Sequence, residues 1–282
     1  MNILEAIVLG IIQGVTELLP ISSTGHLTVA GKLMNLISND KPQEWTAFMA
    51  VIQLGTMASI IIYFWKDLIN ILVHFWKENV KGKTGFSSQS LQSRTGWFII
   101  VGTIPVVIIG LLFKKVIEGA FTKELYVIAV NLIVFALILA AAEKVGKRKK
   151  TEKDISLPDS LFIGIAQAFA LIPGASRSGT TITGALFCGL QREDAARFSF
   201  LLSVPAVLAS GLLEFYESLT WLNNTMWINL IVSTVTAGIC GYIAIDFLLK
   251  YLRKHSTFLF IYYRIIAGVL ILLLIWYNFI QS

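Results

Sequence analysis

The chain has 282 residues, of which 56% are hydrophobic and only 14% are charged, and its mean hydropathy is +0.74. A soluble domain of this length does not carry so much apolar surface, so the composition excludes that class and indicates a polytopic membrane protein. We assign the net charge of +6 to loops beside anionic lipid, and expect membrane lipids but no nucleic acid as partners.

The first predicted element is a helix at residues 2–19, which breaks at Pro20, followed by a shorter helix at residues 25–37. Proline lacks a backbone N–H and clashes with the preceding helical turn. The second piece is shorter than the ~20 residues that a span needs. We therefore interpret residues 2–37 as a re-entrant hairpin. One full span followed by an amphipathic segment is the competing interpretation.

Polar side chains interrupt this apolar hairpin. Gln13 and Glu17 are four residues apart, so they share one helix face. Ionisable groups at hydrocarbon depth are costly, which makes Glu17 and His26 functional candidates. The loop between the two helical pieces is rich in hydroxyls and small residues: Ser22, Ser23, Thr24 and Gly25.

Further apolar runs predict three spans in each half of the chain. In the first half, residues 1–143, the spans are expected at 45–65, 96–113 and 125–142, with a polar loop at 66–95. A Lys- and Arg-rich stretch, residues 144–156, forms a basic cytoplasmic linker. The second half, residues 157–282, begins with a broken helix at 157–190 and continues with spans at 195–216, 227–249 and 258–280.

The two halves resemble each other in sequence. With a shift of 154 positions, matching residues are Gly10 and Gly164, Gln13 and Gln167, Ser22 and Ser176, and Gly25 and Gly179. The likeness extends to the second spans, where Val101 and Gly110 match Val232 and Gly241. Because each half has an odd number of spans, the halves must lie inverted. The predicted fold is an all-α integral membrane protein of two inverted-topology repeats.

Lysines and arginines give the orientation. The loops on the side of the two termini carry five: Lys32, Lys41, Lys114, Lys115 and Lys123. The opposite side carries sixteen. Cytoplasmic loops are enriched in Lys and Arg, so both termini are expected outside the cell. Arg264 is expected near the cytoplasmic end of its span, snorkelling or paired, and Glu214 at the outer interface.

The chemistry of the loops favours a phosphate site. A helix N-terminus preceded by small residues offers unpaired N–H groups to an anion, and the Arg177 guanidinium suits phosphate bidentately. Glu17 is the only carboxylate at the matching break of the first half, and we assign it to a metal ion, so the substrate phosphate is the expected partner of Arg177. The candidate binding groups are Ser22, Thr24, Gly25, Gly174, Ser176, Ser178, Gly179 and Thr181.

A carboxylate beside phosphate implies a bridging divalent cation, Mg²⁺ or Ca²⁺, held by Glu17 with Gln13. The catalytic candidates are Glu17, Ser23, His26 and Arg177. His26 is suited to act as base, acid or nucleophile, and a serine activated by a base is equally permitted. Ser23 and His26 are three residues apart, so both are expected to face the second loop. We favour Ser23 as the nucleophile with His26 assisting.

Residues 13–26, Gln-Gly-Val-Thr-Glu-Leu-Leu-Pro-Ile-Ser-Ser-Thr-Gly-His, and 173–179, Pro-Gly-Ala-Ser-Arg-Ser-Gly, resemble the two signatures of the bacterial undecaprenyl-diphosphate phosphatases of the bacitracin-resistance type. Gln13 is the Gln variant of a position that is also Glu in the family, so a second carboxylate is absent. The resemblance covers essentially the whole chain. It implies a polyprenyl diphosphate substrate, hydrolysis to the monophosphate carrier lipid of peptidoglycan synthesis, a divalent cation and an outward-facing site in the bacterial cell membrane.

Two other functions are weighed against this one. Inverted repeats with broken helices are also transporter architecture, so a lipid-phosphate or anion transporter, or a flippase, is the main rival. The other class of membrane lipid phosphatases is set aside, because the His and Asp that its motif places after the Arg are missing downstream of Arg177. A homodimer is left open.

Overall fold

The computed structural model describes residues 1–37, 42–118, 124–218, 224–277 and 279–280.

Capping side chains fix where the two broken helices begin. Asn2 accepts the N–H of Glu5 at the start of α1 (Ile3–Leu18). Ser156 accepts the N–H of Asp159 at the start of α8 (Leu157–Ala168). In both cases the acidic side chain bonds back to the capping residue, which satisfies N–H groups that the helix itself leaves unpaired.

The chain is helical nearly throughout, and the described residues contain no β-structure beyond one isolated bridge between Lys150 and Leu190. The other elements in chain order are α2 (Ser23–Leu33), α3 (Pro42–Tyr63), α4 (Trp65–Phe75), the π-helix η1 (Trp76–Lys81), the 3-10 turn η2 (Phe86–Ser88), α5 (Leu91–Leu112), α6 (Lys114–Glu118), α7 (Leu125–Val145), η4 (Glu152–Asp154), η5 (Phe169–Leu171), α9 (Arg177–Phe187), α10 (Arg192–Ser218), α11 (Asn224–Leu252) and α12 (Phe258–Trp276).

The expected six spans are confirmed. Within the described ranges, six helices are long and apolar enough to cross a membrane, namely Glu44–Tyr63, Leu91–Leu112, Leu125–Val145, Arg192–Glu217, Trp227–Leu252 and Phe258–Trp276. The protein is therefore an all-helical, multi-pass membrane protein. Lys41 and Lys123, two of the basic residues assigned to the outer side, lie outside the described residues.

The predicted loop at 66–95 is wrong over its first half. Residues 65–81 form α4 and η1 instead. Leu68 and Ile71 are three apart, and both pack into the hydrophobic core, whereas Trp65 and Leu72 are exposed. An amphipathic stripe of this kind stabilises a helix against its neighbour, here α5, although the overall composition is polar.

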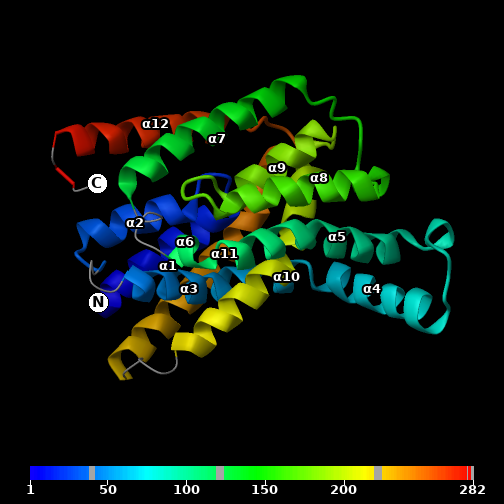
Figure 1. Ribbon diagram of the computed structural model, residues 1–282, viewed down its shortest axis with the longest axis horizontal. Coiled ribbons are helices and arrows are strands. Elements are labelled where there is room, and N and C mark those ends of the chain that lie inside the picture. The colour runs from blue at the N-terminus through cyan, green and yellow to red at the C-terminus, as the bar shows by residue number, and fades with distance from the viewer. Residues whose placement is uncertain (38–41, 119–123, 219–223, 278, 281–282) are drawn as a thin grey trace.

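The two broken helices approach from opposite ends of the bundle. Figure 1 shows α1 and α2 near the end of the bundle where α12 ends, with α8 and α9 toward the other end. Helix α1 packs on α11, and α8 packs on α5, so each broken helix rests on a long helix from the other half of the chain. The breaks, residues 19–22 and 169–176, meet in the interior.

Small residues allow these helices to touch. A Cβ added at Gly10 would lie 2.6 Å from the Ser233 carbonyl oxygen, and one added at Gly164 would overlap the Gly102 backbone. Serine hydroxyls then join the same pairs: Ser233 Oγ donates to Ala6 O (2.9 Å), and Ser160 Oγ donates to Phe98 O (2.5 Å). Close backbone approach with serine hydrogen bonds is a common way for membrane helices to associate.

A buried carboxylate holds the other end of the bundle together. Glu143, at the end of α7, is 2% exposed and pairs with Arg148 of the linker and with Arg192 at the start of α10. Its second oxygen accepts the hydroxyl of Thr257, which precedes α12 (2.8 Å). The basic linker is thus fixed to the helix bundle by ion pairs.

Candidate active site

The loops that break the two helices have the same local structure. Ser22 and Ser176 have φ values of 74° and 71°, a left-handed conformation that is uncommon for residues other than glycine. Each serine then caps the helix that follows: Ser22 Oγ accepts the N–H of Gly25 (3.4 Å), and Ser176 Oγ accepts the N–H of Gly179 (3.2 Å). Strained backbone of this kind is often found at functional sites.

Arg264 joins the two loops. It is fully buried, and its guanidinium donates to Pro20 O (3.4 Å) in the first loop and to Gly174 O (3.1 Å) and Ala175 O (2.8 Å) in the second. Its Nε donates to Leu132 O of α7 (3.3 Å). The expectation that Arg264 snorkels or pairs near the cytoplasmic surface is wrong, because broken helices leave carbonyl groups unpaired and the guanidinium has five donors to satisfy them.

An ionic cluster lies where the loops meet. Glu17, at the end of α1, has a side chain that is 4% exposed. Its Oε1 accepts Arg177 Nη2 at 2.6 Å, and its Oε2 accepts Ser23 Oγ at 2.5 Å and Gln13 Nε2 at 3.4 Å. Each half of the chain therefore supplies part of one charged centre.

The pairing of Arg177 differs from the expectation. We expected its guanidinium to be left for substrate phosphate, but it binds Glu17 directly, because a guanidinium and a carboxylate at this depth neutralise each other. Only Nη2 is engaged in this ion pair. Arg177 Nη1 is buried and has no hydrogen-bond partner among the described residues, and the same holds for Gln13 Oε1.

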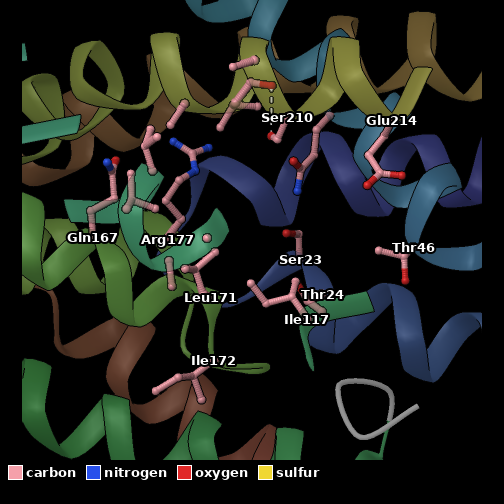
Figure 2. A pocket seen from close by; sticks show the side chains of 18 of the residues that line it. Ser23, Thr24, Thr46, Ile117, Gln167, Leu171, Ile172, Arg177, Ser210 and Glu214 are labelled. Atoms are coloured by element: carbon pink, nitrogen blue, oxygen red, sulfur yellow. Dashed lines mark hydrogen bonds between the residues drawn. The ribbon is translucent and has the colours of Figure 1, made fainter. Parts of the chain in front are cut away.

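A cavity of about 370 Å³ opens beside this cluster. Its wall includes seven of the expected site residues: Glu17, Ser22, Ser23, Thr24, Gly174, Ser176 and Arg177. Figure 2 shows Ser23, Thr24 and Arg177 around it, with the apolar side chains of Leu171 and Ile172 on the same wall. The cavity is thus mostly apolar, with a polar and charged group at the loops, which suits an amphiphilic ligand with an anionic head.

Other expected site residues lie behind this wall. Gln13 backs Glu17, and Gly25 and Gly179 sit in the caps. Ser178 Oγ donates to Leu19 O (2.9 Å), which ties the second loop to the end of α1. Thr181 is fully buried and bonds to Ser199 and to Arg177 O. These groups hold the loops in place rather than line the cavity.

His26 lies outside the cavity wall. Its Nδ1 donates to Ser22 O (2.7 Å), and its Nε2 accepts the hydroxyl of Tyr263 (2.6 Å), whose ring stacks on the imidazole. The expectation that Ser23 and His26 both face the second loop is therefore wrong. Ser23 turns to Glu17, whereas His26, one turn later on α2, turns to α12.

Sequence reasoning missed several residues of the cavity. Glu214 and Ser210 of α10 contribute to the wall, as Figure 2 shows, so Glu214, which we expected at the outer interface, belongs to the cavity. Thr46, Gln53, Lys114 and Gln167 are the other polar members. Only Gln167 carried a signal in the sequence, its match to Gln13. The others come from spans whose rotation the sequence does not fix.

Comparison with known proteins gives consistent results. Residues 6–270 match the family model described as bacitracin resistance protein BacA. The chain is 52% identical to a protein of Syntrophobacter fumaroxidans, with 95% of each chain covered, and 49% identical to one of Chloroherpeton thalassium, with 96% of each covered. A relative from Myxococcus xanthus is 46% identical, with 98% of this chain and 90% of the relative covered. All three relatives are named undecaprenyl-diphosphatase.

The Arg264 contacts predict a large loss of stability when they are removed. In Arg264→Leu, four carbonyl groups lose their donor inside the bundle, so we expect the free energy of unfolding to fall by about 3 kcal/mol or more. Arg253→Leu is the control, because it breaks an ion pair with Glu193 at the surface, where solvent screens the charges and the pair contributes little stability. Thermal unfolding in detergent measures both. Equal melting temperatures for the two variants would contradict the bridging role.

Proposed function

The chain belongs to the bacitracin resistance protein BacA family, and on that premise we infer that it is a membrane phosphatase. It hydrolyses undecaprenyl diphosphate to undecaprenyl phosphate and inorganic phosphate, which recycles the lipid carrier of peptidoglycan synthesis and confers resistance to bacitracin. The observation that carries this function is the hydrogen-bonded set of Ser23, Glu17 and Arg177 at the wall of a largely apolar cavity.

We propose that Ser23 is the nucleophile and Glu17 its base. The Ser23 hydroxyl already donates to Glu17 Oε2 at 2.5 Å, the contact that a base needs to take the proton as Oγ attacks. A bond forms between Oγ and the terminal phosphorus, and the bond from that phosphorus to the bridging oxygen breaks, releasing the lipid monophosphate. Glu17 gives the proton it took to the bridging oxygen as the lipid monophosphate leaves, which restores the carboxylate. The carboxylate then deprotonates a water that attacks the phosphoserine. The bond from phosphorus to Oγ breaks, Oγ takes the proton back from Glu17, and phosphate is released.

Arg177 and the loop residues would hold the diphosphate. Arg177 keeps Glu17 oriented through Nη2 and presents the buried, unpartnered Nη1 for a phosphate oxygen. Ser22, Thr24, Gly174 and Ser176 line the cavity beside it, at the N-termini of α2 and α9. A guanidinium and two helix N-termini stabilise the negative charge that builds up on the transferring phosphoryl group. His26 and Tyr263 would fix the Ser22 carbonyl from the far side.

The residues present fit an oxygen-preferring divalent cation, Mg²⁺ or Ca²⁺. Gln13 Oε1 is buried without a partner next to the Glu17 carboxylate, and such oxygens are the ligands that these ions prefer. Three or more His, Cys, Asp or Glu side chains do not gather anywhere in the described part of the chain, so phosphate oxygens of the substrate would complete the ligand set. When bound, the cation would polarise the phosphoryl group and neutralise its charge.

The rival function, transport of a lipid phosphate or anion, explains less of the site. A transport site needs only to bind its cargo and to release it, so it has no need of a hydroxyl hydrogen-bonded to a carboxylate. The contact of Ser23 with Glu17 therefore favours hydrolysis.

We propose that the two halves, residues 1–143 and 157–282, are inverted repeats, each with one re-entrant hairpin and three spans. Equivalent contacts support this: Gly10 meets Ser233, and Gly164 meets Gly102, where each broken helix crosses the second span of the other half. At 16 residues α1 is about 24 Å long, shorter than the hydrocarbon core, which favours a hairpin over a full span.

The proposed orientation places both termini and the active site outside, with residues 144–156 in the cytoplasm. The start of α1 and the end of α12 lie at one end of the bundle in Figure 1, and the cavity wall extends from the loops to α6 and the last turns of α10. The charge bias of the loops supports the same orientation. The homodimer left open by the sequence stays a prediction.

Purified protein should release phosphate from undecaprenyl diphosphate, which a transporter would not do.

Ser23→Ala should lower kcat about a hundredfold or more, because the nucleophile and its base act as a unit. His26→Ala should lower it by less than about tenfold, because the imidazole lies outside the cavity. With label in the terminal phosphate, acid quenching should yield phosphoserine at Ser23. Label on His26 after alkaline quenching would show that His26, not Ser23, is the nucleophile. A wild-type protein that releases no phosphate would refute the phosphatase function.

Chelation should abolish phosphate release, and Mg²⁺ or Ca²⁺ should restore it. Gln13→Glu adds a second carboxylate beside Glu17, so it should lower the cation concentration needed for half-maximal activity by about tenfold. The control is Gln89→Glu, because Gln89 is also a buried glutamine but lies in the segment before α5, far from Glu17 in the sequence. Full activity in the presence of chelator would contradict the proposed requirement for a divalent cation.

The orientation can be tested with reporter fusions in cells. Alkaline phosphatase, which is active only outside the cytoplasm, should be active when fused after residue 282 and inactive when fused at Gly85, in the segment between η1 and α5. Green fluorescent protein at the same two points should give the opposite pattern. Fluorescence at the C-terminal fusion would show the reverse orientation.

A further inference from the structure

Gln167 is a fully buried side chain whose amide is not satisfied by the protein. Its exposed fraction is 0%, and neither Nε2 nor Oε1 has a hydrogen-bond partner among the described residues. Burying an unpaired amide costs free energy, so native proteins seldom retain one without a ligand or water to complete it. The amide is also part of the cavity wall.

The repeat explains why Gln167 lacks a protein partner. In the first half, Gln13 donates to Glu17, four residues later on α1. The position four residues after Gln167 is Leu171, which has no polar atom to offer. The second copy therefore retains the amide but not the carboxylate, so the donor and the acceptor of the Gln167 amide lack the partner that Glu17 provides in the first copy.

Arg177 also has one N–H group without a hydrogen-bond partner among the described residues. Its Nη1 is buried without a partner, although Nη2 is bound to Glu17. In the view of Figure 2 the amide of Gln167 and the guanidinium of Arg177 lie at one end of the cavity. Helices α8 and α9, which carry them, pack closely where Ala166 faces Gly184. Two unpartnered N–H donors from adjacent helices therefore belong to residues at the same end of the cavity wall.

We propose that Gln167 binds the diphosphate of the substrate, with Nε2 donating to a non-bridging phosphate oxygen alongside Arg177 Nη1, and Oε1 accepting from a water or a protonated phosphate oxygen. An amide satisfies both roles at once, which neither a lysine nor a leucine would do. The proposal deepens the proposed function, because it adds a substrate contact from α8 to a site otherwise built from α1, α2 and α9.

The test compares two buried glutamines. Gln167→Met keeps the length of the side chain and removes both hydrogen-bonding atoms. Because nothing in the protein depends on them, its melting temperature without ligand should be unchanged or higher. The kcat/KM for undecaprenyl diphosphate should fall by about 10- to 100-fold, the loss expected for a hydrogen bond to a charged group.

The matched control is Gln89→Met. The Gln89 amide donates to Asn79 Oδ1 (2.8 Å) and Thr84 O (3.0 Å), and its Oε1 accepts Ser93 Oγ (3.1 Å), away from the cavity. This variant should melt several degrees lower and retain its kcat/KM. A lower melting temperature for Gln167→Met together with wild-type kcat/KM would show that Gln167 is structural and overturn the proposal.

Binding of pyrophosphate tests the role of Gln167 independently of the proposed phosphatase function. Pyrophosphate should raise the melting temperature of the wild type and of Gln89→Met, but should raise that of Gln167→Met much less. If the wild type hydrolyses no lipid, the proposed function fails, and the pyrophosphate shifts still decide the role of Gln167. If the wild type is active and the two shifts are equal, the proposal on Gln167 fails alone.

Discussion

Two helices end inside this protein, and each end leaves backbone carbonyls and N–H groups where there is little water to receive them. The structure meets this demand with a few side chains. Ser22 and Ser176 cap the helices that follow, and Arg264 donates to carbonyls of both loops and of α7. Irregular backbone at membrane depth is tolerated only when protein groups or a water-lined cavity satisfy it. The candidate site depends on this bracing, because Glu17 and Arg177 lie next to the braced residues.

The site is composite, and its charges are balanced before a ligand arrives. Glu17 from one half binds Arg177 from the other, so neither is left as an isolated ion in the interior. Several polar atoms near the ion pair have no hydrogen-bond partner among the described residues. They are one nitrogen of Arg177, one oxygen of Gln13, and both the nitrogen and the oxygen of the Gln167 amide. Phosphate oxygens can accept from the Arg177 and Gln167 nitrogens without breaking the pair, so Glu17 keeps its contact with Ser23.

The sequence predicted the spans and the two loops well, because both are local properties. Apolar runs mark the six spans, and Pro20 together with the Ser- and Gly-rich stretches marks the breaks. It could not predict contacts that depend on how distant helices rotate against one another. Arg264 lies in an ordinary span by composition, and only the packing of α12 on α7 brings its guanidinium to the loops. His26 was misplaced for the same reason, since Tyr263 of α12 draws it away from the cavity.

The crossing of α1 with α11 bears on how the protein is made. Helix α1 ends at Leu18, and its packing partner begins at Asn224, so about two hundred residues separate them in the chain. At roughly 5–20 residues per second, a ribosome needs about 10–40 s to cover that distance. Throughout this interval the face of α1 that carries Gly10 and Gly14 has no α11 to pack on, and for most of it Glu17 has no Arg177 to pair with. The broken helix α1–α2 is therefore synthesised long before the helix against which α1 packs.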